Sequence, residues 1–192
     1  MKLRQFTAGV TPSSGFTLIE LLVTITVAGI LLGIAVPAFD GFLKNDRDTG
    51  QANSLVSSFN YARSEAVKRA SPNGITVCPS LDGLQCDPAP VSWIEGWIVT
   101  YIDPSNNANN QVLQAVPALN PANTVNTAVG PATGITFQSS GLTNAPAPGL
   151  VIRICDTRGA AFARQVEVNS TGRVAASQKP GFSVSGTALT CP

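Results

Sequence analysis

GFTLIELLVTITVAGILLGIAVPAF, residues 15 to 39, is an apolar run with a single carboxylate, that of Glu20. As a helix, the 24 residues from Phe16 to Phe39 would extend about 36 Å at about 1.5 Å per residue. That length is enough to cross a hydrocarbon core of about 30 Å. A carboxylate inside such a segment is unfavourable, and ionisable residues there usually have a function and a partner. The sequence therefore predicts a transmembrane helix over residues 16–39 in which Glu20 has a specific role.

The composition predicts one domain joined to this anchor. The chain has 192 residues, of which 44% are hydrophobic and only 12% are charged. Its 17 glycines and 14 prolines are concentrated after Ser71, which favours a β-rich, loop-rich domain. The formal net charge of +1 argues against a protein that binds nucleic acid by bulk charge.

The residue types that most enzymes need are missing. The chain has no histidine, so it lacks the commonest general base and the commonest metal ligand. No G-x-G-x-x-G or P-loop pattern is present, and nucleotide binding therefore has no support. We expect no enzymatic activity, no cofactor and no metal site.

Four cysteines, an even number, allow three disulfide connectivities. A zinc site would need all four thiolates and no C-x2-C pair is present, while free thiols are a second alternative. Export past a membrane anchor favours disulfides. We expect one bridge to close a short loop and another to tie the C-terminal tail to a central strand. These pairs are Cys78 with Cys86 and Cys155 with Cys191.

The flanks of the apolar run predict its orientation. Lys2 and Arg4 precede it without any acid, so the N-terminus should stay cytoplasmic and everything after Phe39 should lie outside. The run is too long for an ordinary secretory signal, and a helical pattern follows it rather than a mature N-terminus. A simple uncleaved signal anchor is the alternative.

The stretch Gly15-Phe16-Thr17-Leu18-Ile19-Glu20-Leu21-Leu22 resembles the processing motif of type IV pilins and of type II secretion pseudopilins. This resemblance implies that prepilin peptidase removes residues 1–15 by cutting after Gly15, and that Phe16 is then N-methylated. It also implies that residues 16–39 anchor the chain in the inner membrane before assembly. They then pack with other major and minor pilins in the filament core.

The resemblance supplies a partner for Glu20, the fifth residue after the cut. Glu20 of one subunit can meet the cationic N-terminal amine, at Phe16, of a neighbour. A buried ion pair must offset its own desolvation, so its best use is to set the register of docking. The alternative is that Glu20 extends to the lipid headgroups. Pro37 lies where pilins also have a proline, and we expect a helix bend there.

Beyond Phe39, apolar residues recur mostly at steps of three and four, which predicts an amphipathic helix over residues 40–71. The segment Ser71-Pro72-Asn73-Gly74 should end it. Arg63, Glu65 and Lys68 are interpreted as its solvated face. The apolar positions are Ala52, Leu55, Val56, Phe59, Ala62 and Ala66.

After Gly74 the pattern changes to strands, which predicts a β-rich periplasmic domain over residues 72–192. The segment 169–172 should be a hairpin turn, 106–110 a turn or loop, and 117–131 a poorly regular connection. The fold class is α+β: a long N-terminal helix packed on an antiparallel β-sheet domain, the ladle shape of pilins. Strands are expected at 75–78, 93–101, 112–116, 135–138, 150–155, 165–168 and 173–176.

The domain resembles the GspH/FimT branch of this family in Cys78-x7-Cys86, Trp93…Gly96-Trp97, Cys155-Asp156 and Gly172-Arg173. The resemblance implies a minor pilin of a type IV pilus that helps initiate assembly or sits at or near the tip. The subunit would reside in the inner membrane, single-pass, and then in the pilus filament at the cell surface. A GspH-like minor pseudopilin of type II secretion is the alternative.

A third function, DNA binding during natural transformation, is implied by FimT-like members, which use a G-R-x-R pattern. Here Gly172-Arg173-Val174-Ala175 keeps the first arginine and replaces the second, so DNA is a partner we do not favour. The charge is nevertheless uneven, because residues 70–150 contain four acids and no Lys or Arg. Candidate contacts for DNA or a protein partner are Arg158, Arg164, Arg173 and Lys179.

Overall fold

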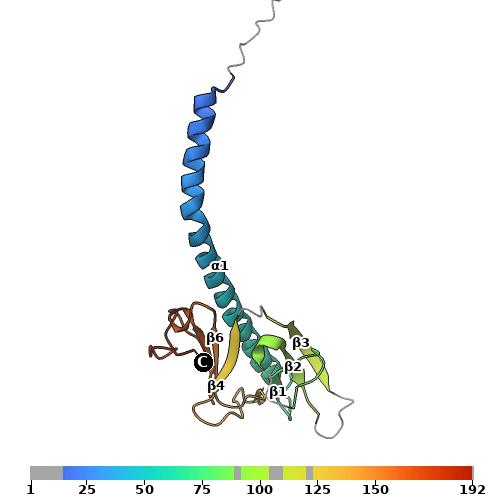
Figure 1. The fold of residues 1–192 in the computed structure, drawn as a ribbon. Helices are drawn as coiled ribbons and strands as arrows, with labels where there is room; N and C mark the ends of the chain where they lie inside the picture. The colour runs from blue at the N-terminus through green and yellow to red at the C-terminus, as the bar shows by residue number, and fades with distance from the viewer. Residues whose placement is uncertain (1–14, 89–91, 104–109, 120–122, 192) are drawn as a thin grey trace, which may run out of the picture. The chain divides into compact units, whose positions relative to one another are not determined.

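The computed structural model describes residues 15–88, 92–103, 110–119 and 123–191 (Figure 1). It consists of two compact units, residues 1–42 and residues 43–192. The first contains the apolar half of the long helix, and the second contains the rest of that helix and all the strands.

One helix, α1 (Leu18–Lys68), is 51 residues long. It is also the one helix among the described residues that is long and apolar enough to cross a membrane, with a mean hydropathy of 2.4 in its most apolar window. Position 37 lies inside the helix, so Pro37 does not end it. The side chain of Pro37 lies outside the described residues, and the bend expected there stays a prediction.

The predicted amphipathic pattern of α1 is confirmed. Ala52, Leu55, Phe59, Ala62 and Ala66 are all buried, because successive steps of three and four residues keep them on one face of the helix. They form one hydrophobic cluster with residues from every strand of the domain except β8 and β3, whose apolar side chains pack at its margin.

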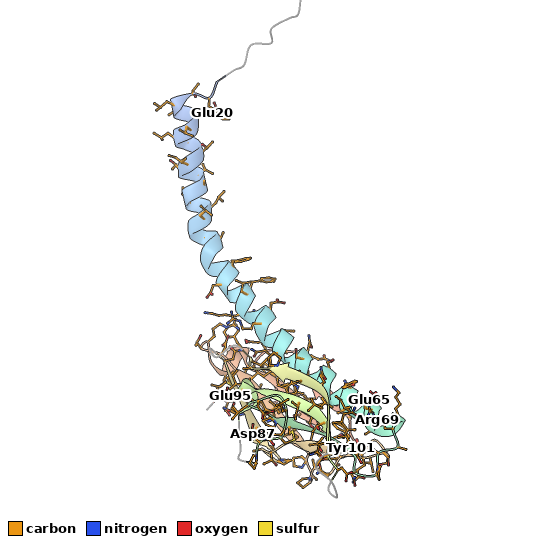
Figure 2. The ribbon with its side chains drawn as sticks, turned by 90° about the vertical axis from the view of Figure 1, so that its right-hand side faces the viewer. Glu20, Glu65, Arg69, Asp87, Glu95 and Tyr101 are labelled. Atoms are coloured by element: carbon orange, nitrogen blue, oxygen red, sulfur yellow. A yellow bond between two sulfur atoms is a disulfide. The ribbon has the colours of Figure 1, made fainter. Side chains whose placement is uncertain are left out.

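Glu65 departs from the expectation of a solvated side chain. It is buried, accepts a hydrogen bond from Arg69 Nε at 2.6 Å and lies 3.5 Å from Lys68 Nζ (Figure 2). The hydrogen bond from Arg69 is the main reason that the pKa of Glu65 lies below its ordinary value. The helical periodicity assigned Glu65 to the solvated face, because it could not show that neighbouring residues would cover the side chain.

α1 ends in a turn that reverses the chain toward the first strand. Ser71 N–H donates to the carbonyl of Ala66 and Ala70 N–H to that of Val67, each at 3.2 Å. Ala70 has a φ of +46°. This is the Schellman arrangement, in which the residue with positive φ is usually glycine.

The strands form two four-stranded antiparallel sheets where the sequence predicted one (Figure 1). The first has the order β3-β2-β1-β5, and the second has the order β4-β6-β7-β8. Their core residues share one cluster with α1, so the domain has a single core. The strands of the first sheet are β1 (Ile75–Pro79), β2 (Gly96–Tyr101), β3 (Gln111–Pro117) and β5 (Ile135–Phe137). Those of the second are β4 (Thr124–Val129), β6 (Leu150–Cys155), β7 (Arg164–Val168) and β8 (Val174–Ala176).

Aromatic side chains occupy the centre of this core. The ring centroid of Phe59 lies 5.8 Å from that of Trp93 and 6.5 Å from that of Phe137. Each indole N–H has an acceptor: Trp93 donates to Thr127 Oγ1 at 3.0 Å and Trp97 to Ser58 Oγ at 2.9 Å. The interpretation of both tryptophans as core residues is therefore confirmed.

Two expected segments differ in the structure. Trp93–Glu95 forms a short 3-10 helix, η1, rather than the start of a strand, because Ser92 Oγ accepts from Ile94 N–H and Gly96 has a φ of +106°. A Cβ at Gly96 would lie 2.5 Å from the carbonyl oxygen of Val116, so only glycine fits there.

The segment 117–131, expected to be irregular, contains β4, which pairs with β6. The flanking prolines, asparagines and glycine hid a β-branched run that becomes regular only beside its partner strand. The expected hairpin turn at 169–172 is confirmed, with Gly172 N–H donating to the carbonyl of Asn169 at 2.9 Å. Most of the expected turn at 106–110 lies outside the described residues.

Candidate functional site

The N-terminal junction is built around the first turn of α1. Thr17 precedes the helix, and its Oγ1 accepts the N–H of Glu20 at 3.2 Å. Thr-x-x-Glu at a helix start is a capping box, and a carboxylate is favoured there because the first turn presents unpaired N–H groups. Glu20 thus lies at the helix end, three residues beyond the exposed cap (Figure 2).

The apolar half of α1 has no cover within its own unit. Phe16 is 81% exposed, and the large apolar side chains after it that the structure describes, up to Phe39, are exposed as well. A surface of this size and composition does not stay in water, so it is covered by lipid or by other helices. The exposed side chains from Leu18 to Phe39 are Leu18, Ile19, Leu21, Leu22, Val23, Ile25, Val27, Ile30, Leu31, Leu32, Ile34 and Phe39.

Both disulfides form the pairs expected from the sequence. Cys78, in β1, bonds to Cys86 eight residues later, and Cys155, at the end of β6, bonds to Cys191 across a separation of 36 residues. The second bridge packs in a small satellite cluster with Ala163 and Leu189. The described cysteines include no free thiol.

The four cations expected to form one surface are divided by the structure. Arg158 is largely but not fully buried: its Nη2 lies 2.9 Å from Asp48 Oδ2, its Nε pairs with Asp156, and its side chain is 15% exposed. Arg164 donates to Thr49 Oγ1 at 3.0 Å, which ties β7 to α1. Neither guanidinium is therefore available as a surface contact in the way the charge pattern suggested.

Arg173 and Lys179 do lie together at the surface. Both are exposed, and both line a groove of about 520 Å³ beside β8. Lys179 Nζ lies 4.5 Å from the ring centroid of Phe182, which also lines the groove. Of the predicted basic surface, only this pair stays together.

No pattern in the sequence indicated the polar cluster around Asp48. Asn123 Nδ2 donates to Asp48 Oδ1 at 2.7 Å and to Gln51 Oε1 at 2.8 Å, while Arg158 Nη1 donates to Asn45 Oδ1 at 2.8 Å. Asp48 is only 2% exposed. Burial raises the pKa of the Asp48 carboxyl, opposed by the hydrogen bond from Asn123 and reinforced by the charge of Asp156. These residues lie too far apart in sequence to be grouped from the pattern alone.

Comparison with solved structures finds the same fold. Two crystal forms of the type IV minor pilin FimU of Pseudomonas aeruginosa strain PAO1 are each 20% identical to this chain. One covers 72% of this chain and 98% of its own with a TM-score of 0.52, and the other covers 67% and 91% with a TM-score of 0.51. The minor pseudopilin EpsH of the type 2 secretion system of Vibrio cholerae is 13% identical over 68% of this chain and 96% of its own, with a TM-score of 0.49. No curated protein matches the chain.

Two family models match the sequence. The model for the prokaryotic N-terminal methylation motif matches residues 11–36, and the model for type II transport protein GspH matches residues 51–172. The methylation motif implies processing by prepilin peptidase and assembly with other pilins. Since the second match covers more than half of the sequence and the fold is that of a pilin, the chain belongs to the GspH family, whose members are structural pilin-type subunits and not enzymes.

Proposed function

We propose that this chain is a minor pilin of a type IV pilus that helps initiate assembly or lies at or near the tip. The exposed apolar half of α1, which begins at the processing motif, is the observation that supports this proposal most. Such a surface suits a subunit that leaves the membrane only to enter the core of a filament. The two disulfides and the FimU-like sequence features of the second half favour the pilus over a secretion system.

The proposal assigns a step to each part of the chain. Residues 1–15 form a leader that prepilin peptidase removes, and Phe16 becomes the N-methylated N-terminus. Residues 16–39 span the inner membrane and later the filament core. Residues 40–71 form the half of the helix that supports the periplasmic domain, residues 72–192, which reaches the cell surface within the filament.

Glu20 sets the register of docking in this proposal. Its carboxylate lies in the first turn of α1, close in sequence to the amine that cleavage creates at Phe16. In the low dielectric of a helix bundle a carboxylate of one subunit and an amine of the next attract strongly, but only when they meet. A subunit that docks out of register leaves both charges buried and unpaired, which costs about 3–5 kcal/mol.

A second candidate function is a minor pseudopilin of type II secretion, because the matching family model describes a type II transport protein. Deletion of the gene distinguishes the two. We expect loss of surface pili, seen by electron microscopy, with normal export of a secreted reporter enzyme. Loss of export with normal piliation would instead support the pseudopilin.

Processing is tested separately by the intact mass of membrane-extracted protein. We expect a chain that begins at Phe16 and has one added methyl group, whereas Gly15→Val should stay uncut. Gly41→Ala is the matched control, because a Cβ there meets no other atom within 4 Å. Retention of residues 1–15 in the native protein would contradict the proposal.

A further inference from the structure

The loop between β1 and η1 presents two leucines on a closely held backbone. Residues 80–87, which we name the leucine loop, are closed by the Cys78–Cys86 bridge. Ser80 Oγ donates to the carbonyl of Gln85 at 2.6 Å, and Asp87 Oδ2 accepts Leu81 N–H at 2.7 Å. Despite this internal order, Leu81 is 61% and Leu84 is 74% exposed.

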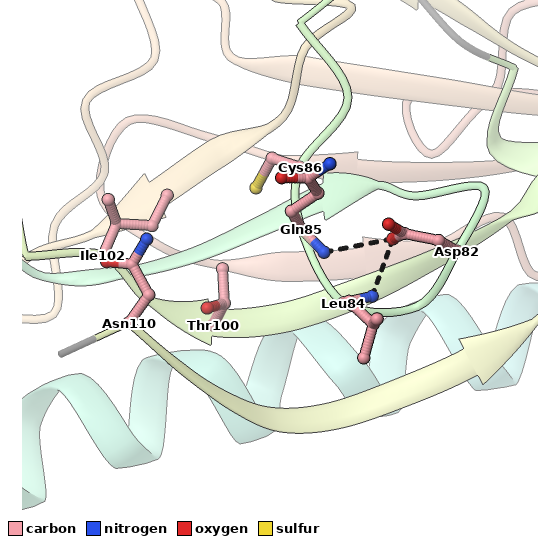
Figure 3. Close-up of a pocket in the computed structure, with 7 residues that line it drawn as sticks. All are labelled: Asp82, Leu84, Gln85, Cys86, Thr100, Ile102 and Asn110. Carbon is pink, nitrogen blue, oxygen red and sulfur yellow. Dashed lines mark hydrogen bonds between the residues drawn. The ribbon is translucent and has the colours of Figure 1, made fainter. Parts of the chain in front are cut away.

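Asp82 holds the tip of the leucine loop. Its Oδ1 accepts the N–H of Leu84 at 2.8 Å and that of Gln85 at 3.2 Å (Figure 3). These two hydrogen bonds keep the pKa of Asp82 below its ordinary value, so the carboxylate stays charged. The backbone that presents the leucines is therefore held before any partner arrives, and little backbone entropy is lost when one does.

Two hollows border the leucine loop. One, of about 390 Å³, is lined by Leu81, Glu95 and the exposed edge strand β3. The other, of about 620 Å³, is lined by Leu84, Thr100 and Asn110 (Figure 3). One exposed leucine thus lines each hollow, and both are open to a partner.

The charge around the leucine loop restricts the partner. Its ionisable residues, Asp82 and Asp87, and nearby Glu95 are all acidic, and residues 70–150 contain no Lys or Arg. A complementary surface must therefore combine apolar side chains with cations.

The other sheet of the same domain has such a surface. The groove beside β8, which we name the basic groove, is lined by Arg173, Ala175, Lys179, Phe182 and Val184. Its two cations are exposed, and Gln178 and Ser183 line it together with these apolar side chains. Its volume of about 520 Å³ is large enough for two leucine side chains and the turn that joins them.

We propose that the leucine loop of one copy of this chain docks in the basic groove of a second copy. The two surfaces have no residue in common and belong to different sheets, so the contact is heterologous and leaves a free loop and a free groove at the ends. Contacts of this kind add subunits in one direction, as a filament requires. This inference rests on the proposed function, in which pilin-type domains lie side by side.

The test uses the full chain in its own membrane. In one copy, the photo-crosslinking residue p-benzoylphenylalanine replaces Leu84 (Leu84→p-benzoylphenylalanine). A coexpressed copy has a different epitope tag. We expect a light-dependent adduct between the two copies whose crosslinked peptide lies within residues 173–186. Arg173→Glu with Lys179→Glu in the second copy should lower the adduct yield by about fivefold or more.

Matched controls isolate the contact. The photo-crosslinker at Val129, an exposed residue on β4 at the opposite edge of the sheet from β8, should give no adduct with the second copy. Lys68→Glu, at an exposed cation on α1, should leave the yield from position 84 unchanged. Crosslinking to a different protein, an equal yield from position 129, or indifference to the charge reversal would each overturn the proposal.

A photo-crosslinker at Val27, in the apolar half of α1, separates this inference from the proposed function. An adduct with other pilins from position 27 but none with a second copy from position 84 overturns the contact and leaves the proposed function standing. No adduct from either position, together with absence of the chain from sheared filaments, overturns both.

Discussion

Glu20 has two uses at the residue scale, and substitutions can separate them. Within the chain its N–H donates to Thr17 Oγ1 and its carboxylate suits the first turn of α1, and between chains it would pair with an N-terminal amine. Glu20→Gln keeps a side chain suited to the capping box but removes the charge, whereas Thr17→Val removes the cap and keeps the charge.

We expect Glu20→Gln and Glu20→Ala to insert in the membrane more easily than the native chain but to enter filaments about tenfold less or worse. Thr17→Val should be incorporated at close to the native level. The measurement is the ratio of subunit in sheared filaments to subunit in membranes, by immunoblot. Native incorporation of Glu20→Gln would show that the charge has no part in docking.

Arg158 is the second residue whose role is open to test. It pairs with the buried carboxylates of both Asp48 and Asp156, so Arg158→Ala leaves two neighbouring acids without a cation. We expect a loss of about 3–5 kcal/mol in the free energy of unfolding at pH 7. Urea denaturation of residues 43–192, which contain both hydrophobic clusters, measures it.

The loss of unfolding free energy caused by Arg158→Ala should be smaller at pH 4 than at pH 7. Because the folded domain raises the pKa of Asp48, the folded state binds this proton more tightly than the unfolded chain. The contribution of the protonated Asp48 carboxyl to stability is therefore largest below its ordinary pKa and is lost as the pH rises through the raised value.

Arg164→Ala, which removes bonds to the neutral oxygens of Thr49 and Gln178, is the control and should cost about 1 kcal/mol at either pH. Equal losses for Arg158→Ala at pH 4 and pH 7 would contradict this account.

At the scale of single elements, the end of α1 contains a local conflict between sequence and conformation. Ala70 adopts a φ of +46°, which is unfavourable for any residue with a Cβ. Ala70→Gly should therefore stabilise the domain by about 1 kcal/mol. Ser64→Gly, at an exposed position inside the same helix, should instead destabilise it by about 0.5 kcal/mol, since glycine is a poor helix former. Urea midpoints measure both, and a destabilised Ala70→Gly would show that the turn gains nothing from glycine.

The two disulfides should differ in what they contribute. Replacing Cys155 and Cys191 by serine opens a loop with a separation of 36 residues and should cost about 4 kcal/mol by the chain-entropy model. The same change at Cys78 and Cys86, eight residues apart, should cost about 2.5 kcal/mol. Urea denaturation of the two double variants gives the order, and a larger loss for the short loop would contradict the entropic account.

At the scale of the whole molecule, the placement of the four candidate cations favours a protein over DNA as the partner. Two of the four candidates bond within the domain, and Arg173 and Lys179 are left at one groove. Few phosphates could be neutralised there, so we expect DNA binding no tighter than the about micromolar-to-weaker non-specific range.

Arg173→Ala should therefore lower filament incorporation more than it lowers DNA binding. Filter binding at two salt concentrations and immunoblots of sheared filaments measure the two effects. Tight, salt-sensitive DNA binding that disappears in Arg173→Ala while piliation is unchanged would reverse the order.

The features that depend on local chemistry could be predicted from the sequence alone. The processing motif around Gly15, the apolar run that follows it and the buried stripe from Ala52 to Ala66 are each defined by neighbouring residues or by helical spacing. Most strands were also predictable, because β-branched residues and turn residues alternate along the chain.

Contacts between distant segments could be seen only in the folded chain. β4 is regular because β6 lies beside it, and the arrangement of two sheets around one core is a matter of strand pairing, for which the sequence contains no local signal. Arg158 illustrates the same limit: its charge suggested a surface contact, yet it meets Asp48, 110 residues away, inside the domain. Burial and pairing of a charge depend on what the fold places around it, and the leucine loop and basic groove likewise become surfaces only once the chain has closed its core.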